Sequence, residues 1–217
     1  AAAEPLPLAV PPVLLLTPLE PGGEADLAVW WTKKGFNGIV FQNLIGDLNT
    51  PLALTSGEDG GDSALVEKVR AANAPLAEAG LRRNFLAIPI APEDAWFTDR
   101  EKTRAALARF REAGTLCQKT GLRGIAVDIG PSRAILDYRW EGYDLDEMPA
   151  PAIAQRARDF GRRALRAFFR EYPRGEILVV CENLDEAGPL WFALFNGMVE
   201  SLGAAQDLQI HLLARDT

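Results

Sequence analysis

The sequence predicts an α/β fold of repeated strand–helix units whose parallel sheet is wound as a (β/α) barrel. Six short apolar runs alternate with longer segments in which apolar residues recur at helical spacing. Continuous apolar runs are typical of strands buried on both faces of a parallel sheet, and one-sided helices cover such a sheet. The chain has 217 residues, of which 48% are hydrophobic, and this composition supports a sizeable core.

The predicted strands share a short apolar composition and a following loop. They are residues 13–16, 38–42, 84–90, 124–128, 176–182 and 208–214. Residues 1–11 are rich in Ala and Pro and are expected to form a flexible arm, and residues 12–217 a single barrel-like domain. Eight strand–helix units need roughly 250 residues, so six units predict a barrel that is truncated or closed by another segment.

Three of the intervening segments have a clear apolar stripe. The stripes are Leu65, Val69, Ala72 and Leu76; Thr103, Leu107, Phe110, Gly114 and Cys117; and Ile153, Ala157, Phe160, Ala164 and Phe168. Pro75 is expected to end or kink the first of these helices, because it removes a hydrogen-bond donor. The last helix also carries five arginines on its other side, a pattern typical of a solvated face: Arg156, Arg162, Arg163, Arg166 and Arg170.

Residues that cap helices occur where each helix is expected to begin or end. Asp62 or Ser63 precedes one helix and Asp99 the next, and such side chains accept hydrogen bonds from free backbone N–H groups. Three glycines follow helices and precede strands, as C-terminal caps do: Gly35, Gly80 and Gly121.

The loop lengths favour a TIM-barrel-like closure over the alternative, an open doubly wound sheet. Loops after the strands are long and those before the strands are tight, as in barrels whose sites are built from loops. The first turn, residues 17–23, lacks the G-x-G-x-x-G spacing of a doubly wound dinucleotide-binding domain.

Composition excludes several classes of function. The net charge of −7 gives no support for nucleic-acid binding, and no apolar run is long enough for a membrane span. One histidine and two cysteines are too few for a zinc-type site, and no P-loop, HExxH or Ser-His-Asp pattern is present. We therefore expect neither a metal nor a cofactor, and we expect Cys117 and Cys181 to be buried thiols and His211 a packed strand residue.

The first residues resemble the mature end left by signal-peptide cleavage. Small residues at positions 1–3 are followed by Glu4 and Pro5. The expected location is therefore periplasmic or secreted.

Acidic residues follow several of the predicted strands. In barrels, side chains at the carboxyl ends of strands face the site. Asp128, Glu182 and Asp216 occupy such positions, with Asp128 and Glu182 on neighbouring strands. Two carboxylates at one mouth, one acting as acid and the other as base or nucleophile, are what glycosidic-bond hydrolysis requires. These three residues are the candidate catalytic residues, although Asp and Glu at strand ends also cap helices and pair with Arg.

Polar and aromatic residues in the same loops are candidates for substrate binding. Aromatic faces beside carboxylates suit sugar rings, so an oligosaccharide or polysaccharide is the expected partner. The alternative is that the aromatic side chains pack over the barrel mouth or against a protein partner. The candidates are Gln42, Asn43, Trp96, Tyr138, Trp140, Tyr143 and Asn183.

Three segments resemble bacterial glycoside-hydrolase-like barrels: residues 30–40, 120–128 and 192–200. The resemblance implies a (β/α) barrel acting on glycans. It also implies a second acid close after the fourth-strand aspartate, where this chain has Gly130, and two further strands. Two hypotheses follow, an exported glycoside hydrolase and a catalytically inactive barrel-derived subunit that docks on a larger extracytoplasmic assembly.

Overall fold

The computed structural model describes residues 14–18, 24–42, 44, 51–55, 61–89, 97–128, 136–181, 188–202 and 210–214. The predicted arm, residues 1–11, lies outside these ranges. Among the described residues, no helix has the length and apolar character needed to span a bilayer.

Six parallel strands form one sheet in which spatial order follows chain order. Each strand pairs with the next one along the chain, from β1 with β2 to β5 with β6. A doubly wound sheet reverses its strand order at a switch point, so this order confirms barrel-type winding. Within the described residues β1 and β6 do not pair with each other, and the sheet is not closed. The strands are β1 (Leu14–Pro18), β2 (Gly38–Gln42), β3 (Phe85–Pro89), β4 (Gly124–Asp128), β5 (Glu176–Cys181) and β6 (Ile210–Ala214).

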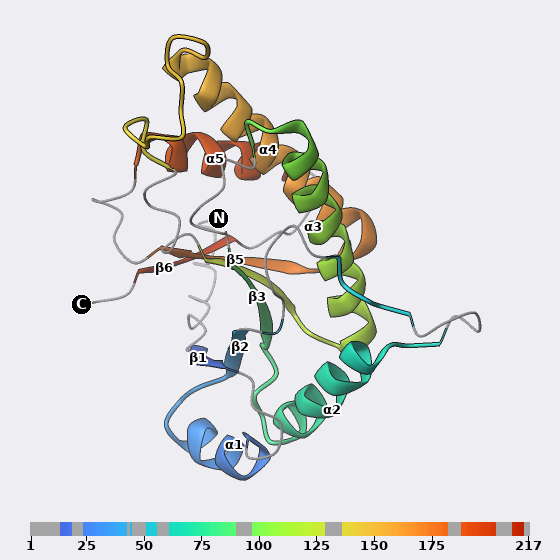
Figure 1. The fold of residues 1–217 in the computed structure, drawn as a ribbon. Helices are drawn as coiled ribbons and strands as arrows, with labels where there is room; N and C mark the ends of the chain where they lie inside the picture. Colours follow the sequence, from blue (N-terminus) through green and yellow to red (C-terminus); the bar gives the residue numbers. More distant parts are fainter. Residues whose placement is uncertain are drawn as a thin grey trace, which may run out of the picture.

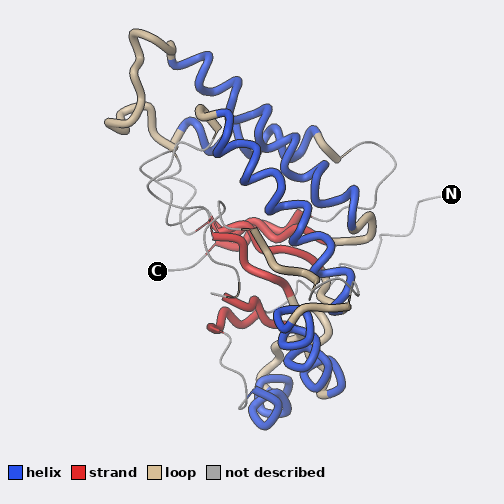
Figure 2. The backbone as a smooth tube through the Cα atoms, turned by 45° about the vertical axis from the view of Figure 1, so that its right-hand side comes forward, coloured by secondary structure: helices blue, strands red, loops and turns tan. Residues whose placement is uncertain are grey.

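In the described ranges the chain forms five helices, which cover one side of this sheet (Figures 1 and 2). Successive helices contact each other, so they form a curved outer layer that follows the strands around. This arrangement is expected when every crossover between parallel strands has the same right hand. The helices are α1 (Glu24–Lys33), α2 (Ala64–Glu78), α3 (Arg100–Thr120), α4 (Ala150–Glu171) and α5 (Pro189–Glu200).

The two faces of the sheet bury different sets of residues, because side chains alternate along a strand. Ile125 and Val127 of β4 lie in the large core between sheet and helices, whereas Ala126 lies in a smaller cluster on the inner face. The members of that inner cluster are Val40, Phe85, Ala87, Ala126 and Leu178. The sheet is thus apolar on both faces, as the continuous apolar runs predict.

The helix ends confirm most of the predicted caps. Ser63 accepts a hydrogen bond from the N–H of Val66, and Asp99 accepts from those of Glu101 and Lys102. The three predicted capping glycines have positive φ: Gly35, Gly80 and Gly121.

Two local expectations are corrected. Asp62 does not cap α2; it contacts Arg70 and Lys119, each at 2.6 Å. Of the two effects expected of Pro75, ending the helix is wrong, since α2 continues to Glu78, whereas a kink stays a prediction. Pro75 lies in the last turn, where its missing N–H removes only one of the final hydrogen bonds of the helix.

Two glycines allow α4 and α5 to approach each other closely. A Cβ atom at Gly161 of α4 would overlap the carbonyl oxygen of Leu194, and one at Gly197 of α5 would overlap that of Arg158. Any larger residue at either position therefore forces the two helices apart.

Buried polar side chains join elements at the amino-terminal side of the sheet. The Asn84 Oδ1 atom accepts a hydrogen bond from the Ile39 N–H at 3.0 Å, and its Nδ2 donates to Asn73 Oδ1 at 2.7 Å. At the start of β5, Glu176 contacts both Arg83 and Arg123 at 2.7 Å. Burial raises the pKa of Glu176, but the hydrogen bonds from Arg123 and Arg83 outweigh it, and the net pKa lies below the usual value.

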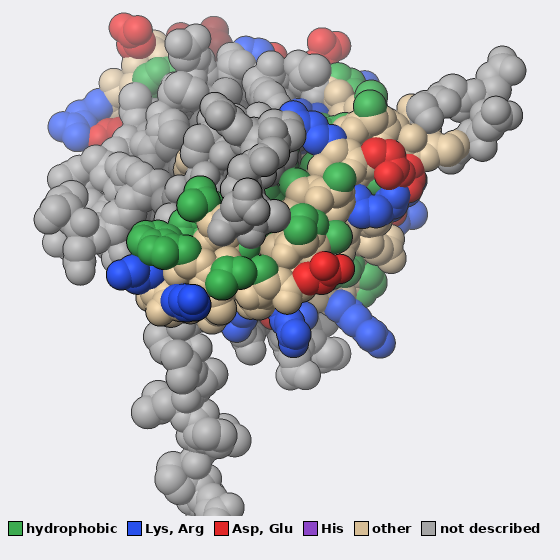
Figure 3. Space-filling model, turned by 90° about the horizontal axis from the view of Figure 1, so that it is seen from below, with side chains coloured by type: hydrophobic (Ala, Val, Ile, Leu, Met, Phe, Trp, Pro, Cys, Tyr) green, Lys and Arg blue, Asp and Glu red, His purple; other side chains and the backbone are tan. Residues whose placement is uncertain are grey.

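The exposed large hydrophobic side chains lie mostly on the first and last helices of the layer. Leu27, Val29 and Trp30 of α1 are about half exposed, as are Phe192 and Val199 of α5. Figure 3 views the molecule from the α1 end, where hydrophobic side chains reach the surface among lysines and arginines. We refer to these five residues as the flank residues.

Candidate functional site

The carboxyl ends of the six strands meet at one edge of the sheet, because all strands run parallel. Asp128 is the last residue of β4 and is in register with Pro89 of β3 and Val180 of β5. Gln42 ends β2, is partly buried, and is in register with Pro18 of β1. The edge thus has polar residues at the ends of strands whose inner faces are apolar.

Several candidate residues fall outside the described part of the chain. For Asp128 the structure describes the position of the backbone in β4 and not that of the side chain. Glu182 directly follows Cys181, the last residue of β5. Its role, like the roles of the other candidates outside the described residues, stays a prediction. The candidates outside the described residues are Asn43, Trp96, Glu182, Asn183 and Asp216.

The three described aromatic candidates lie in the segment between β4 and α4. Tyr138, Trp140 and Tyr143 are partly buried against the main core. The rings of Trp140 and Tyr143 meet edge to face with centroids 4.9 Å apart, and Tyr143 lies 6.1 Å from Phe97. Phe97 precedes α3 in the chain, so the aromatic side chains connect two strand–helix loops.

This segment is anchored at both ends. The Leu136 carbonyl oxygen accepts a hydrogen bond from the N–H of Leu190 in α5, at 3.1 Å. The Asp144 carboxylate accepts from the N–H groups of Asp146 and Glu147, which fixes the turn before α4. The aromatic side chains are therefore held in place by backbone contacts as well as by ring packing.

A cleft of about 290 Å³ opens beside Tyr143. Three carboxylates line it, those of Asp99, Asp144 and Glu147. Burial raises the pKa of Tyr143, so its hydroxyl stays protonated and can donate a hydrogen bond at neutral pH. An aromatic ring among acidic side chains can hold a polyhydroxylated ligand.

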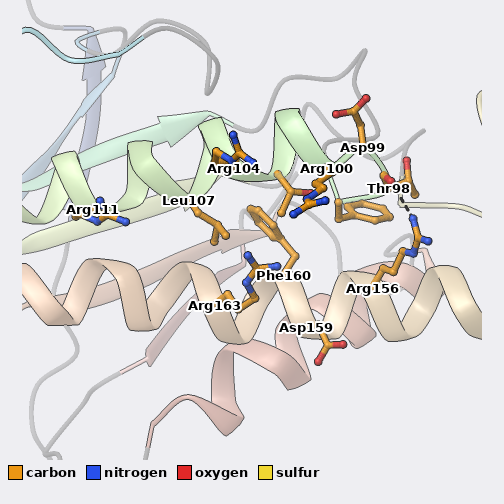
Figure 4. A pocket seen from close by; sticks show the side chains of 12 residues that line it. Thr98, Asp99, Arg100, Arg104, Leu107, Arg111, Arg156, Asp159, Phe160 and Arg163 are labelled. Carbon is orange, nitrogen blue, oxygen red and sulfur yellow. Dashed lines mark hydrogen bonds between the residues drawn. The ribbon is translucent and has the colours of Figure 1, made fainter.

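A second and larger cavity, of about 570 Å³, lies between α3 and α4 (Figure 4). Five arginines line it, and the sequence interpretation missed it as a site. The signal in the sequence was the recurrence of arginine at positions 100, 104 and 111, one face of α3. That this face of α3 lies next to α4 is known only once the strand order is known.

Comparison with known proteins gives matches of structure alone. No family model matches the sequence, and no curated protein matches it. The chain is similar to 2-naphthoyl-CoA reductase in complex with 2-naphthoyl-CoA, with TM-score 0.54 and 14% identity, covering 88% of this chain and 35% of that one. It is also similar to an old yellow enzyme homologue from Zymomonas mobilis, with TM-score 0.54 and 11% identity, covering 94% and 70%.

The chain has a TIM-barrel-type fold. The structural neighbours are TIM-barrel proteins, and the sheet has their parallel strands wound in chain order. Glycoside hydrolases also occur among the matches, such as an endo-1,4-beta-mannanase from Eisenia fetida with TM-score 0.47 and 14% identity, covering 86% of this chain and 60% of that one. The two matches with TM-score 0.54 establish the fold and not the reaction, because TIM barrels carry many chemistries on one scaffold.

Proposed function

We propose that this chain is an exported, glycan-acting barrel domain that hydrolyses glycosidic bonds. The observation that carries the proposal is Asp128, which ends a central strand at the edge where TIM barrels build their sites. Neighbouring strands lie about 4.8 Å apart, so carboxylates at adjacent strand ends fall within the roughly 5–10 Å separations that glycosidases use. Glu182, directly after β5, is the proposed partner of Asp128, and Asp216, shortly after β6, is the alternative.

The reaction needs one carboxylic acid to protonate the leaving oxygen and one carboxylate to act as base or nucleophile. Asp128 and its partner fill these roles, and the cleft at Tyr143 contributes a sugar subsite. Trp96 and Tyr138 extend the proposed contact surface with Trp140, while the amides of Gln42, Asn43 and Asn183 bind sugar hydroxyls.

The test is hydrolysis of a panel of polysaccharides by the full-length protein, measured as the release of reducing ends. On the substrate that is cleaved, Asp128→Asn is expected to lower kcat by about 10²–10⁴-fold, the usual contribution of a general acid or base. Asp146→Asn, at an exposed residue of the turn before α4, is the matched control and should leave kcat unchanged. Equal activity of Asp128→Asn and wild type rules out this assignment.

The flank residues favour a second candidate function, that of a catalytically inactive barrel-derived subunit on a larger extracytoplasmic assembly. Exposed apolar side chains on α1 and α5, at the two ends of an unclosed helical layer, are typical of protein interfaces. The decisive measurement is the mass of the native complex purified from its source, with wild type compared with Trp30→Ser plus Phe192→Ser. A monomer in both preparations eliminates this candidate.

Export is tested separately. We expect the protein in the extracytoplasmic fraction, and its recovery with cytoplasmic markers would contradict the exported location under either function.

A further inference from the structure

A positively charged groove runs between α3 and α4 on the outer surface, and we call it the arginine groove (Figure 4). Residues at i, i+4 and i+11 of a helix share one face, and so do residues at i and i+7. The two helices therefore turn their basic faces toward the same cavity. Its guanidinium groups belong to Arg100, Arg104 and Arg111 of α3 and to Arg156 and Arg163 of α4.

The two carboxylates of the groove already have partners. Asp99 accepts two backbone hydrogen bonds at the start of α3, at 2.8 and 2.9 Å, and these hold its pKa below the usual value. Asp159 accepts from Arg162 at 2.5 Å. The lining thus has three more positive than negative charges, in a chain whose net charge is −7.

Within the described ranges, most of the groove arginines have no acidic partner. Arg156 donates to the Thr98 carbonyl oxygen at 2.9 Å. No carboxylate among the described residues forms an ion pair with Arg100, Arg104, Arg111 or Arg163. Like charges at i and i+4, as at positions 100 and 104, destabilise a helix, and a bound anion offsets that repulsion.

The apolar residues of the groove indicate which class of anionic ligand it can bind. Leu107 lies between the arginines and is partly exposed, whereas Phe97 and Phe160 are only 4% and 2% exposed. With both aromatic faces covered, a sugar ring finds no surface on which to stack. An aliphatic side chain flanked by carboxylates fits this lining better than a uniformly charged polymer does.

The length of the groove fits a short peptide. Eleven residues separate Arg100 from Arg111, or roughly 16 Å along the helix. An extended chain rises about 3.3 Å per residue, so about five residues cover that distance.

We propose that the arginine groove binds a short acidic segment of a partner protein. Its Asp or Glu side chains form bidentate contacts with the guanidinium groups, and one aliphatic side chain packs on Leu107. The groove shares Thr98 and Asp99 with the cleft at Tyr143, but none of its arginines lines that cleft, so the proposal holds whether or not the chain is a hydrolase.

The probe is a fluorescein-labelled hexapeptide in which Asp and Glu alternate with Leu, and binding is measured by fluorescence anisotropy on the whole protein. We expect saturable binding that Arg104→Ala plus Arg163→Ala weakens on the order of tenfold, because two charge-assisted contacts are lost. The matched control is Arg166→Ala plus Arg174→Ala, two exposed arginines outside the groove, which should leave the Kd unchanged. Thermal unfolding of each variant verifies that it is folded.

Three outcomes overturn the proposal. One is equal weakening by the groove and control variants. Another is equal binding of a hexapeptide with Lys in place of Asp and Glu. The third is tighter binding of oligogalacturonate or inorganic phosphate than of the acidic peptide, which would assign the groove to a different anion.

Discussion

Replacing Glu176 by Gln removes the negative charge that Arg83 and Arg123 share at the amino-terminal side of the sheet. The side chain of Glu176 is 8% exposed, that of Arg83 27% and that of Arg123 51%. Breaking a buried ion pair costs about 3–5 kcal/mol, and the share of Arg123 is discounted because water screens its exposed charge. The expected loss in the free energy of unfolding is therefore about 2–3 kcal/mol, or roughly 7 °C in Tm for a chain of this size.

Urea unfolding at a series of pH values measures this loss. Because the pKa of Glu176 is lowered in the folded state, its stabilisation is present at neutral pH and disappears as the pH falls below 4.5. The difference between wild type and Glu176→Gln should shrink over that range. Glu147→Gln, at an exposed residue, is the control and should change stability by less than about 0.5 kcal/mol. A loss at pH 7 as small as that of the control, or one that does not change in acid, would refute the reasoning.

Three further predictions concern packing and burial. Gly197→Ala places a Cβ on the Arg158 carbonyl oxygen and should lower the free energy of unfolding by about 1–3 kcal/mol in urea titrations, while Val199→Ala, at an exposed residue of the same helix, is the control and should change it by less than about 0.5 kcal/mol. Asn84→Leu leaves the Ile39 N–H without its partner and should cost about 2–4 kcal/mol by the same method; a change below 0.5 kcal/mol contradicts the role of this hydrogen bond. Cys117 is fully buried and burial raises its pKa, so mass spectrometry should show no alkylation by iodoacetamide at pH 8 until the protein is unfolded, and rapid labelling of the native protein would disprove its burial.

Local patterns predicted the sheet well. The predicted strands at 38–42 and 124–128 coincide with β2 and β4, and the other strands agree to within two residues at each end. These runs are apolar and bounded by glycine or polar residues, so the signal is contained in each segment. The buried position of Cys117 followed in the same way from the apolar stripe of its helix.

Contacts between distant segments were not predictable from local patterns. Glu176 meets Arg83 across 93 residues of chain and Arg123 across 53, and no periodicity connects them. The sequence likewise indicated aromatic residues among acids after β4 and further aromatic residues after β3, but not the specific contact between Tyr143 and Phe97. The arginine groove required both the helical spacing and the knowledge that α3 and α4 are neighbours.

The one-directional order of the strands has a consequence for biosynthesis. In the part of the chain that the structure describes, each strand pairs with the strands made just before and just after it, so its main partner is already available when it leaves the ribosome. The described sheet can therefore extend progressively from its amino-terminal units, with every new strand–helix pair adding to the part built so far.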